Sequence, residues 1–264
     1  MDLSWIHFVI LIISGIIVGF INTLAGGGTI ISLSVFMLFG LPPQVANGTN
    51  RVAVMLQNTT AVSNFAAKGL IDWKKSLLLS TSIILGSITG TLFAGVISNE
   101  LFKYLFGIVI IFVGIMLVFK PDRWLKEKVQ LLNRPIQWWH YLIMFGIGIY
   151  GGFIHVGVGY MLLAFLVLIS GNELVKANAM KNFLVLTYIP FSLIVFTLQG
   201  NVNWTLGLIH AIGNIIGAQI GALMAVKRGA LLIRYIMLVL MVIVILQLFG
   251  LIDPESVSEW LKKL

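Results

Sequence analysis

Two short polar stretches, each with one cation, stand inside otherwise apolar runs of the chain. They read ANGTNR at residues 46–51 and ANAMKN at residues 177–182. On a helix, the cation of each stretch shares a face with asparagines three or four residues away. A cation beside amide donors is suited to binding an anion, so we expect Arg51 and Lys181 to contact one. The alternative is that both cations only extend to a membrane interface. The anion-contacting set that this pattern predicts is Asn47, Asn50, Arg51, Asn58, Asn178, Lys181 and Asn182.

A glycine-rich break precedes each of these stretches. The first reads NTLAGGGTI at residues 22–30, in the middle of an apolar run, where each glycine weakens a helix by roughly 1 kcal/mol relative to alanine. Free N–H groups at a helix that begins near Gly28 would attract an anion. The alternative is close helix packing at small residues. His155, beside the second break, is a candidate proton relay or else a structural histidine with satisfied hydrogen bonds. The candidate residues at the breaks are Asn22, Gly26, Gly27, Gly28, Thr29, His155, Gly157, Gly159 and Tyr160.

The positions of the acidic residues indicate the sign of the ligand. All nine Asp and Glu residues lie at the ends of apolar runs, in loops or in the C-terminal tail. Cation pumps usually keep a carboxylate within a membrane segment as a ligand or proton relay. Two cations in apolar runs without a carboxylate therefore favour an anionic substrate.

Enzyme and metal signatures are absent from the sequence. There is no cysteine, no H-E-x-x-H pair, no G-x-S-x-G elbow and no P-loop lysine after the glycines. We therefore expect a protein that is not an enzyme, with no catalytic residue, no metal site and no cofactor.

The composition is that of an integral membrane protein. The 264 residues are 59% hydrophobic and only 10% charged, with a mean hydropathy of +1.04, whereas soluble domains carry about 25% charged residues. Apolar runs of membrane-spanning length predict an all-α polytopic fold, with two shorter apolar pieces at 28–40 and 158–170. The predicted spans are 5–24, 46–66, 76–97, 101–119, 138–156, 178–198, 205–226 and 231–250.

The two halves of the chain are related by an offset of 131 residues without gaps. Gly28 pairs with Gly159, the Ala-Asn of residues 46–47 with that of 177–178, and Trp73 with Trp204. Such coincidences of Gly, Asn and Trp indicate an internal repeat. The predicted organisation is a first membrane repeat at 1–119, a cytoplasmic linker at 120–137, a second membrane repeat at 138–250 and a polar C-terminal tail at 251–264.

Loop charges predict that the two repeats have opposite orientations. Loop 67–75 carries three lysines and its counterpart 198–206 none, whereas loop 227–235 is more basic than its counterpart 96–104. By the positive-inside rule, loops 67–75, 120–137 and 227–235 are cytoplasmic. We therefore expect two inverted repeats of about five helical segments each, each opened by a glycine-broken helix or re-entrant hairpin. Inverted repeats with discontinuous helices are typical of secondary transporters.

The two breaks with their flanking residues also resemble a known family. The segment GFINTLAGGGTIISLSVFMLFGLPPQVANGTNR at 19–51, and its degenerate copy GFIHVGVGYMLLAFLVLISGNELVKANAMKN at 152–182, are similar to the sulfite exporter TauE/SafE family, also called the toluene sulfonate uptake permeases. The resemblance covers nearly the whole chain. It implies a membrane carrier for sulfite, thiosulfate, sulfonates or related organic anions, with export favoured over uptake.

The sequence as a whole predicts a multi-pass secondary transporter in the cytoplasmic membrane. Its substrate would be a small sulfur-containing anion, moved by alternating access. A passive anion channel, or a carrier of another small organic anion, is the alternative. The expected partners are the anion and the lipid bilayer, with no nucleic acid; proton coupling and a homodimer stay open.

Overall fold

All regular secondary structure in the described part of the chain is helical. The computed structural model describes residues 5–94, 115, 129–132 and 135–248, and these contain no strand. The all-α prediction is confirmed for them. The described residues of the first half form α1 (Trp5–Leu24), α2 (Thr29–Leu38), α3 (Pro43–Ala67) and α4 (Trp73–Leu92). After α7 (Val129–Leu132) come α8 (Trp138–Phe153), α9 (Val158–Ala164), the π-helical turn η1 (Phe165–Ile169), α10 (Leu174–Leu198) and α11 (Trp204–Leu248).

Four of the described helices, α1, α4, α10 and α11, are long and apolar enough to cross a membrane. Helix α3 has 25 residues but is more polar, because it buries Asn47, Asn50, Arg51, Gln57 and Asn58. The chain is therefore a multi-pass helical membrane protein. The predicted span 101–119, apart from residue 115, most of the linker 120–137 and the tail 251–264 lie outside the described residues.

The backbone breaks at His155, Gly157 and Gly229 set the ends of three predicted spans. Helix α8 ends at Phe153 instead of residue 156, since His155 and Gly157 have positive φ angles of 69° and 72°. The predicted helices 205–226 and 231–250 correspond, over the described residues, to the two helices that make up α11. Its non-helical Gly229 (φ 68°, ψ −161°) separates them.

The described elements recur along the chain with the offset seen in the sequence. Both ends of α10 lie 131 residues after the corresponding ends of α3, and α4 and α11 begin at Trp73 and Trp204. Positive φ angles recur at the same offset in three glycine pairs: Gly26 and Gly157, Gly40 and Gly171, Gly69 and Gly200. The turns as well as the helices therefore follow one plan.

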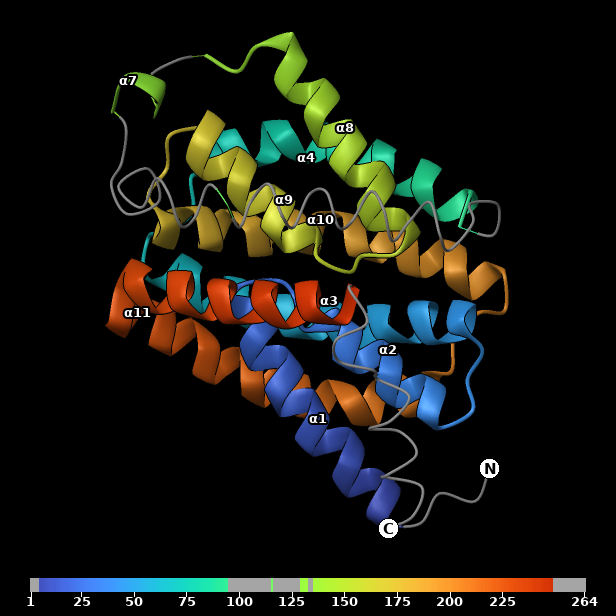
Figure 1. Ribbon diagram of the computed structural model, residues 1–264. Helices are drawn as coiled ribbons and strands as arrows, with labels where there is room; N and C mark the ends of the chain where they lie inside the picture. Colours follow the sequence, from blue (N-terminus) through green and yellow to red (C-terminus); the bar gives the residue numbers. More distant parts are fainter. Residues whose placement is uncertain (1–4, 95–114, 116–128, 133–134, 249–264) are drawn as a thin grey trace.

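Helices from the two halves pair along glycine contacts. Helix α1 packs most extensively on α11, and α4 on α8. A Cβ atom on Gly86 would meet the backbone of Phe145, and one on Gly90 would meet the backbone of Ile149, so α4 and α8 run in the same direction. Figure 1 shows α3 and α10 in the middle, α4 and α8 on one side, and α1, α2 and the first part of α11 on the other.

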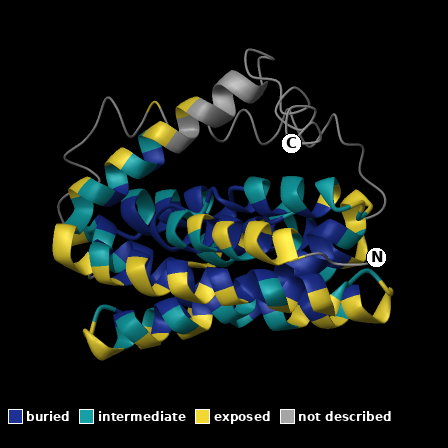
Figure 2. Cartoon of the chain, turned by 90° about the horizontal axis from the view of Figure 1, so that it is seen from below, coloured by how far each residue is buried: buried dark blue, intermediate teal, exposed yellow. Residues whose placement is uncertain are grey.

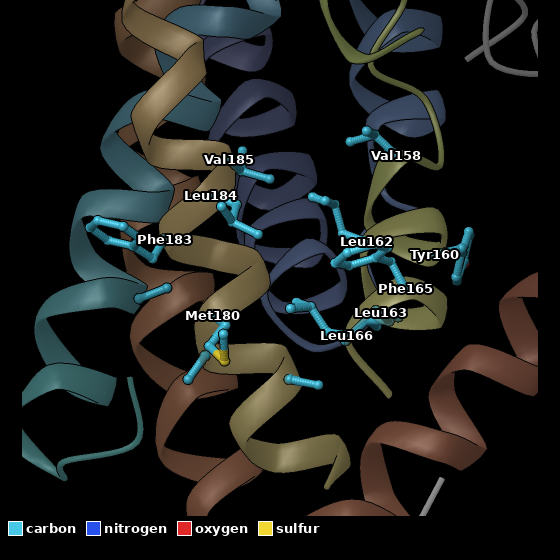
Figure 3. Packing of buried hydrophobic residues seen from close by; sticks show 14 of the residues in the cluster. Val158, Tyr160, Leu162, Leu163, Phe165, Leu166, Met180, Phe183, Leu184 and Val185 are labelled. Atoms are coloured by element: carbon cyan, nitrogen blue, oxygen red, sulfur yellow. The ribbon is translucent and has the colours of Figure 1, made fainter. Parts of the chain in front are cut away.

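Apolar side chains cover the outside of the bundle. Figure 2 shows the exposed residues along the outer edges and the buried residues between the helices. Helices α1, α4, α8 and α11 each begin with an exposed tryptophan, which fits the aromatic belt of a membrane interface. Figure 3 shows the apolar packing between α9–η1 and α10, with Leu162 and Phe165 on the side facing α10 and Tyr160 on the other side.

Candidate functional site

The first glycine break is a short turn between α1 and α2. Gly26 has a φ of 87°, a conformation that glycine adopts readily and residues with a Cβ atom rarely adopt. The backbone N–H of Gly28 donates to the side-chain Oδ1 of Asn22 at 2.7 Å. Asn22 therefore stabilises the turn that leads into α2, as well as lying among the predicted site residues.

The two glycine breaks are in direct contact with each other. A Cβ atom added to Gly26 would lie 2.5 Å from Cα of Gly159, and one added to Gly159 would lie 2.5 Å from Cα of Gly26. A Cβ atom on Gly27 would overlap the hydroxyl of Tyr160. Close packing thus accounts for glycine at these three positions. Anion binding by their N–H groups stays a prediction.

Arg51 binds the C-terminus of α8, which belongs to the other half of the chain. Its Nη1 donates to the carbonyl oxygen of Gly151 at 2.8 Å, and its Nη2 donates to that of Gly152 at 3.1 Å and to Asn47 Oδ1 at 3.2 Å. Asn47 Nδ2 donates to the carbonyl oxygen of Phe153 at 2.7 Å. The last carbonyls of a helix lack intrahelical donors and carry partial negative charge, so a cation stabilises them.

Lys181 binds the C-terminus of α1, which belongs to the first half of the chain. Its Nζ donates to the carbonyl oxygens of Asn22 at 2.8 Å and Thr23 at 3.1 Å. Asn182 Nδ2 also donates to the Thr23 oxygen, at 3.2 Å. Lys181 is only 1% exposed and Arg51 is fully buried, so neither cation extends to an interface. Each half of the chain therefore caps the broken helix of the other half.

A small polar cavity lies where the breaks meet. Its volume is about 10 Å³, roughly enough for one water molecule. It contains residues from both halves: Asn22, Gly26, Gln57, Asn58, His155, Val158, Gly159, Lys181 and Val185. Of the two buried cations, only Lys181 lines it.

The cavity brings together six of the sixteen residues predicted from sequence: Asn22, Gly26, Asn58, His155, Gly159 and Lys181. The remaining ten lie around it and do not line it: Gly27, Gly28, Thr29, Asn47, Asn50, Arg51, Gly157, Tyr160, Asn178 and Asn182. Among these, the side-chain amides of Asn50 and Asn178 are fully buried and have no hydrogen-bond partner in the described part of the chain.

Two residues at the site are not among the sixteen candidates. Gln57 lines the cavity and accepts a hydrogen bond from Asn22 Nδ2 at 3.4 Å through its Oε1. Tyr188 pairs its hydroxyl with Nδ1 of His155 at 2.6 Å. Gln57 directly precedes Asn58, so its polarity inside a helix of the site could have found it.

The site is cationic. Among residues 5–94, 115, 129–132 and 135–248, the buried charged side chains are Arg51 and Lys181, and no Asp or Glu is buried. The same residues contain no cluster of three or more His, Cys, Asp or Glu that could hold a metal ion. The charge around the cavity therefore suits an anion.

Apolar membrane-length helices around a polar cavity formed by two broken helices define the class of polytopic membrane transporters. The chain belongs to the sulfite exporter TauE/SafE family, whose model, described as "Sulfite exporter TauE/SafE", matches residues 11–248. The resemblance noted in the sequence is thus confirmed. Membership in a family of membrane transporters agrees with the lack of enzyme signatures.

Curated relatives are described only as transporters. A "Probable membrane transporter protein" of Haemophilus influenzae is 30% identical over 89% of this chain and 91% of its own length. "Probable membrane transporter protein ORF9" of a Sinorhizobium species is 26% identical over 98% of both chains. "Probable membrane transporter protein YfcA" of Escherichia coli K12 is 24% identical over 96% of this chain and 93% of its own length. No solved structure matches the chain significantly.

Proposed function

We propose that this protein is a secondary transporter that exports a small sulfur-containing anion, such as sulfite, thiosulfate or an organosulfonate, across the cell membrane by alternating access. The observation that carries the proposal is the cavity at the contact between the two breaks. It joins Lys181 of the second half to the side-chain amides of Asn22, Gln57 and Asn58 of the first half, with no buried carboxylate among the described residues. The sulfur chemistry and the direction rest on the description of the family.

The cavity has donors left over for an anion. Lys181 has three N–H groups, and two of them are engaged by the carbonyls of Asn22 and Thr23. Gln57 uses its Oε1 toward Asn22, and its Nε2 donates to no described residue. Charge-assisted hydrogen bonds from an ammonium group are roughly twice as strong as neutral ones. Lys181 is therefore the main anion contact, and Gln57 orients the bound ion.

The size of the cavity supports alternating access over an open pore. A space of about 10 Å³ holds one water and is too small for a sulfur oxyanion. The site must widen to bind, and residues Gly26 and Gly159 are where the two broken helices can separate. An anion channel would instead need a continuous polar path.

Inverted repeats are supported by how the two middle helices meet. Gly48, near the start of α3, lies against Phe196 at the end of α10 and Asn201 just after it. Phe183, near the start of α10, contacts Trp73, which follows α3. The equivalent helices α3 and α10 are thus antiparallel, as an inverted relation requires. The distribution of loop charges points the same way.

Transport is tested with purified protein in liposomes loaded with labelled sulfite, thiosulfate or methanesulfonate. We expect efflux of at least one labelled anion to be faster than from vesicles without protein. Unlabelled anion on the opposite side should accelerate this efflux. Lys181→Ala should abolish it, whereas Lys68→Ala, in an exposed loop, should transport normally. No flux of any anion contradicts the proposal, and flux without acceleration from the opposite side favours the channel.

A further inference from the structure

His155 occupies a backbone conformation that its side chain disfavours. Its φ of 69° is the one positive φ among the described non-glycine residues. Glycine would adopt this conformation without strain, as Gly157 does two residues later. Residues kept in such a conformation cluster at functional sites, where the side chain is needed. The strain points to a use for the imidazole of His155.

The imidazole is placed to accept a proton from the cavity. His155 lines the cavity together with Lys181. Its Nδ1 pairs with the hydroxyl of Tyr188 at 2.6 Å, and its Nε2 has no hydrogen-bond partner among the described residues. With Nδ1–H donating to the Tyr188 oxygen, the lone pair of Nε2 can take up a proton while the bond to Tyr188 persists.

The charges around His155 link proton binding to anion binding. Lys181 lines the same cavity as His155, and Arg51 binds the carbonyl oxygens of Gly151 and Gly152, at the end of the helix that precedes His155. The titratable hydroxyls beside it are those of Tyr188 and of Tyr150, which donates to the carbonyl oxygen of Val156 at 2.6 Å. No carboxylate is buried among the described residues. A third positive charge here is opposed by two cations, and an anion in the cavity offsets that repulsion.

We propose that the transported anion and a proton occupy this cavity together, with the proton on Nε2 of His155, so that transport is coupled to protons. The inference rests on the proposed function, because it needs an anion in the cavity. Coupling between the two ligands is reciprocal: the anion favours protonation of His155, and the proton favours the anion. Loading transfers a proton from hydronium to Nε2, breaking an O–H bond and forming Nε2–H; release returns the proton to water on the opposite side together with the anion.

The test measures protons moved per anion in liposomes. The probes are labelled thiosulfate and methanesulfonate, which stay ionised at neutral pH, so that any proton is carried by the protein. A pH-sensitive dye inside the vesicles reports the protons while the membrane potential is clamped. In the wild type, we expect transport of at least one of these two anions to be accompanied by protons. The proton-to-anion ratio should fall about tenfold or more in His155→Asn and His155→Gly. Both replacements tolerate the positive φ.

A second measurement keeps the proposal testable if these variants transport too slowly. The rise in melting temperature caused by thiosulfate or methanesulfonate should grow as the pH falls in the wild type, because the proton on His155 favours the anion, and this growth should be lost in His155→Asn. His140→Asn, at the start of α8 and away from the cavity, should behave as wild type. Wild-type anion flux without protons, or an unchanged ratio in His155→Asn, overturns the coupling alone. Absence of flux for all anions overturns both proposals.

Discussion

Gly26 and Gly159 meet backbone to backbone, so that neither position has room for a Cβ atom. They come from opposite halves of the chain, and they join the turn after α1 to the first turn of α9. The contact fixes how closely the two broken helices approach. It also determines the size of the polar cavity beside them, which both glycines line.

Replacing Gly159 with alanine should therefore destabilise the protein. The added methyl group must push the Gly26 backbone away, and such overpacking costs typically 1–3 kcal/mol. Thermal unfolding in detergent measures the loss. Gly146→Ala is the matched control, because that glycine is also helical and a Cβ atom there meets nothing within 4 Å. It should leave stability unchanged or raise it by up to about 1 kcal/mol. Equal melting temperatures for the two variants would contradict the contact.

Loss of Arg51 should loosen the end of α8. Arg51→Ala leaves the carbonyl of Gly151 without its donor, whereas that of Gly152 keeps the hydroxyl of Thr91, and a buried unsatisfied group costs about 1–3 kcal/mol. Hydrogen exchange of the peptides that cover the end of α8 and the second break should accelerate. Arg51→Lys should recover only part of the stability, since an ammonium group lacks the guanidinium fork.

Arg228→Ala serves as the control for that experiment because Arg228 is exposed. Its exchange pattern and melting temperature should match those of the wild type. If Arg51→Ala did the same, the capping role of Arg51 would be wrong.

Lys181 differs from Arg51 in lining the cavity, so its loss should weaken ligand binding as well as stability. A hydrogen bond to a charged group contributes about 1.5–3 kcal/mol, which corresponds to roughly 10- to 100-fold in affinity. Lys181→Gln should lower anion affinity by that factor, measured as the shift in melting temperature against sulfite or thiosulfate concentration. An Arg51 variant that still folds should keep an anion-induced shift. A Lys181→Gln protein with wild-type affinity would remove Lys181 from the site.

Gln57→Leu should reduce anion affinity by a smaller factor. A neutral hydrogen bond contributes about 0.5–1.5 kcal/mol, or roughly 2- to 10-fold. Isothermal titration with the same anions measures the change. Thr59→Ala alters the exposed face of the same helix and should bind as the wild type does. Identical binding by Gln57→Leu would show that Gln57 does not contact the anion.

The positions of the helices were accessible to sequence analysis because apolar runs and glycine breaks are local signals. The turn at residues 25–28 and the start of α11 at Trp204 follow directly from them. The position at which α8 ends was harder to predict from the sequence. His155 has no local mark of a positive φ, and the predicted helix therefore runs past Phe153.

The partners of the two cations could not be read from the sequence. Arg51 and Lys181 bind backbone carbonyls 100 and 159 residues away, and every helix has such carbonyls at its C-terminus. The residue types at positions 51 and 181 therefore do not indicate which helix C-terminus each cation binds. The chemistry of Lys181 suggested a site, but only the fold distinguishes it from Arg51 as the cation that reaches the cavity.

The exchange of caps between the halves has a consequence for biosynthesis. The C-terminus of α1 leaves the ribosome long before Lys181 and Asn182, which complete it. During insertion, the first half must keep the last carbonyls of α1 hydrated or loosely paired until α10 arrives. The two halves expressed as separate chains should therefore accumulate only when they are made together in one membrane.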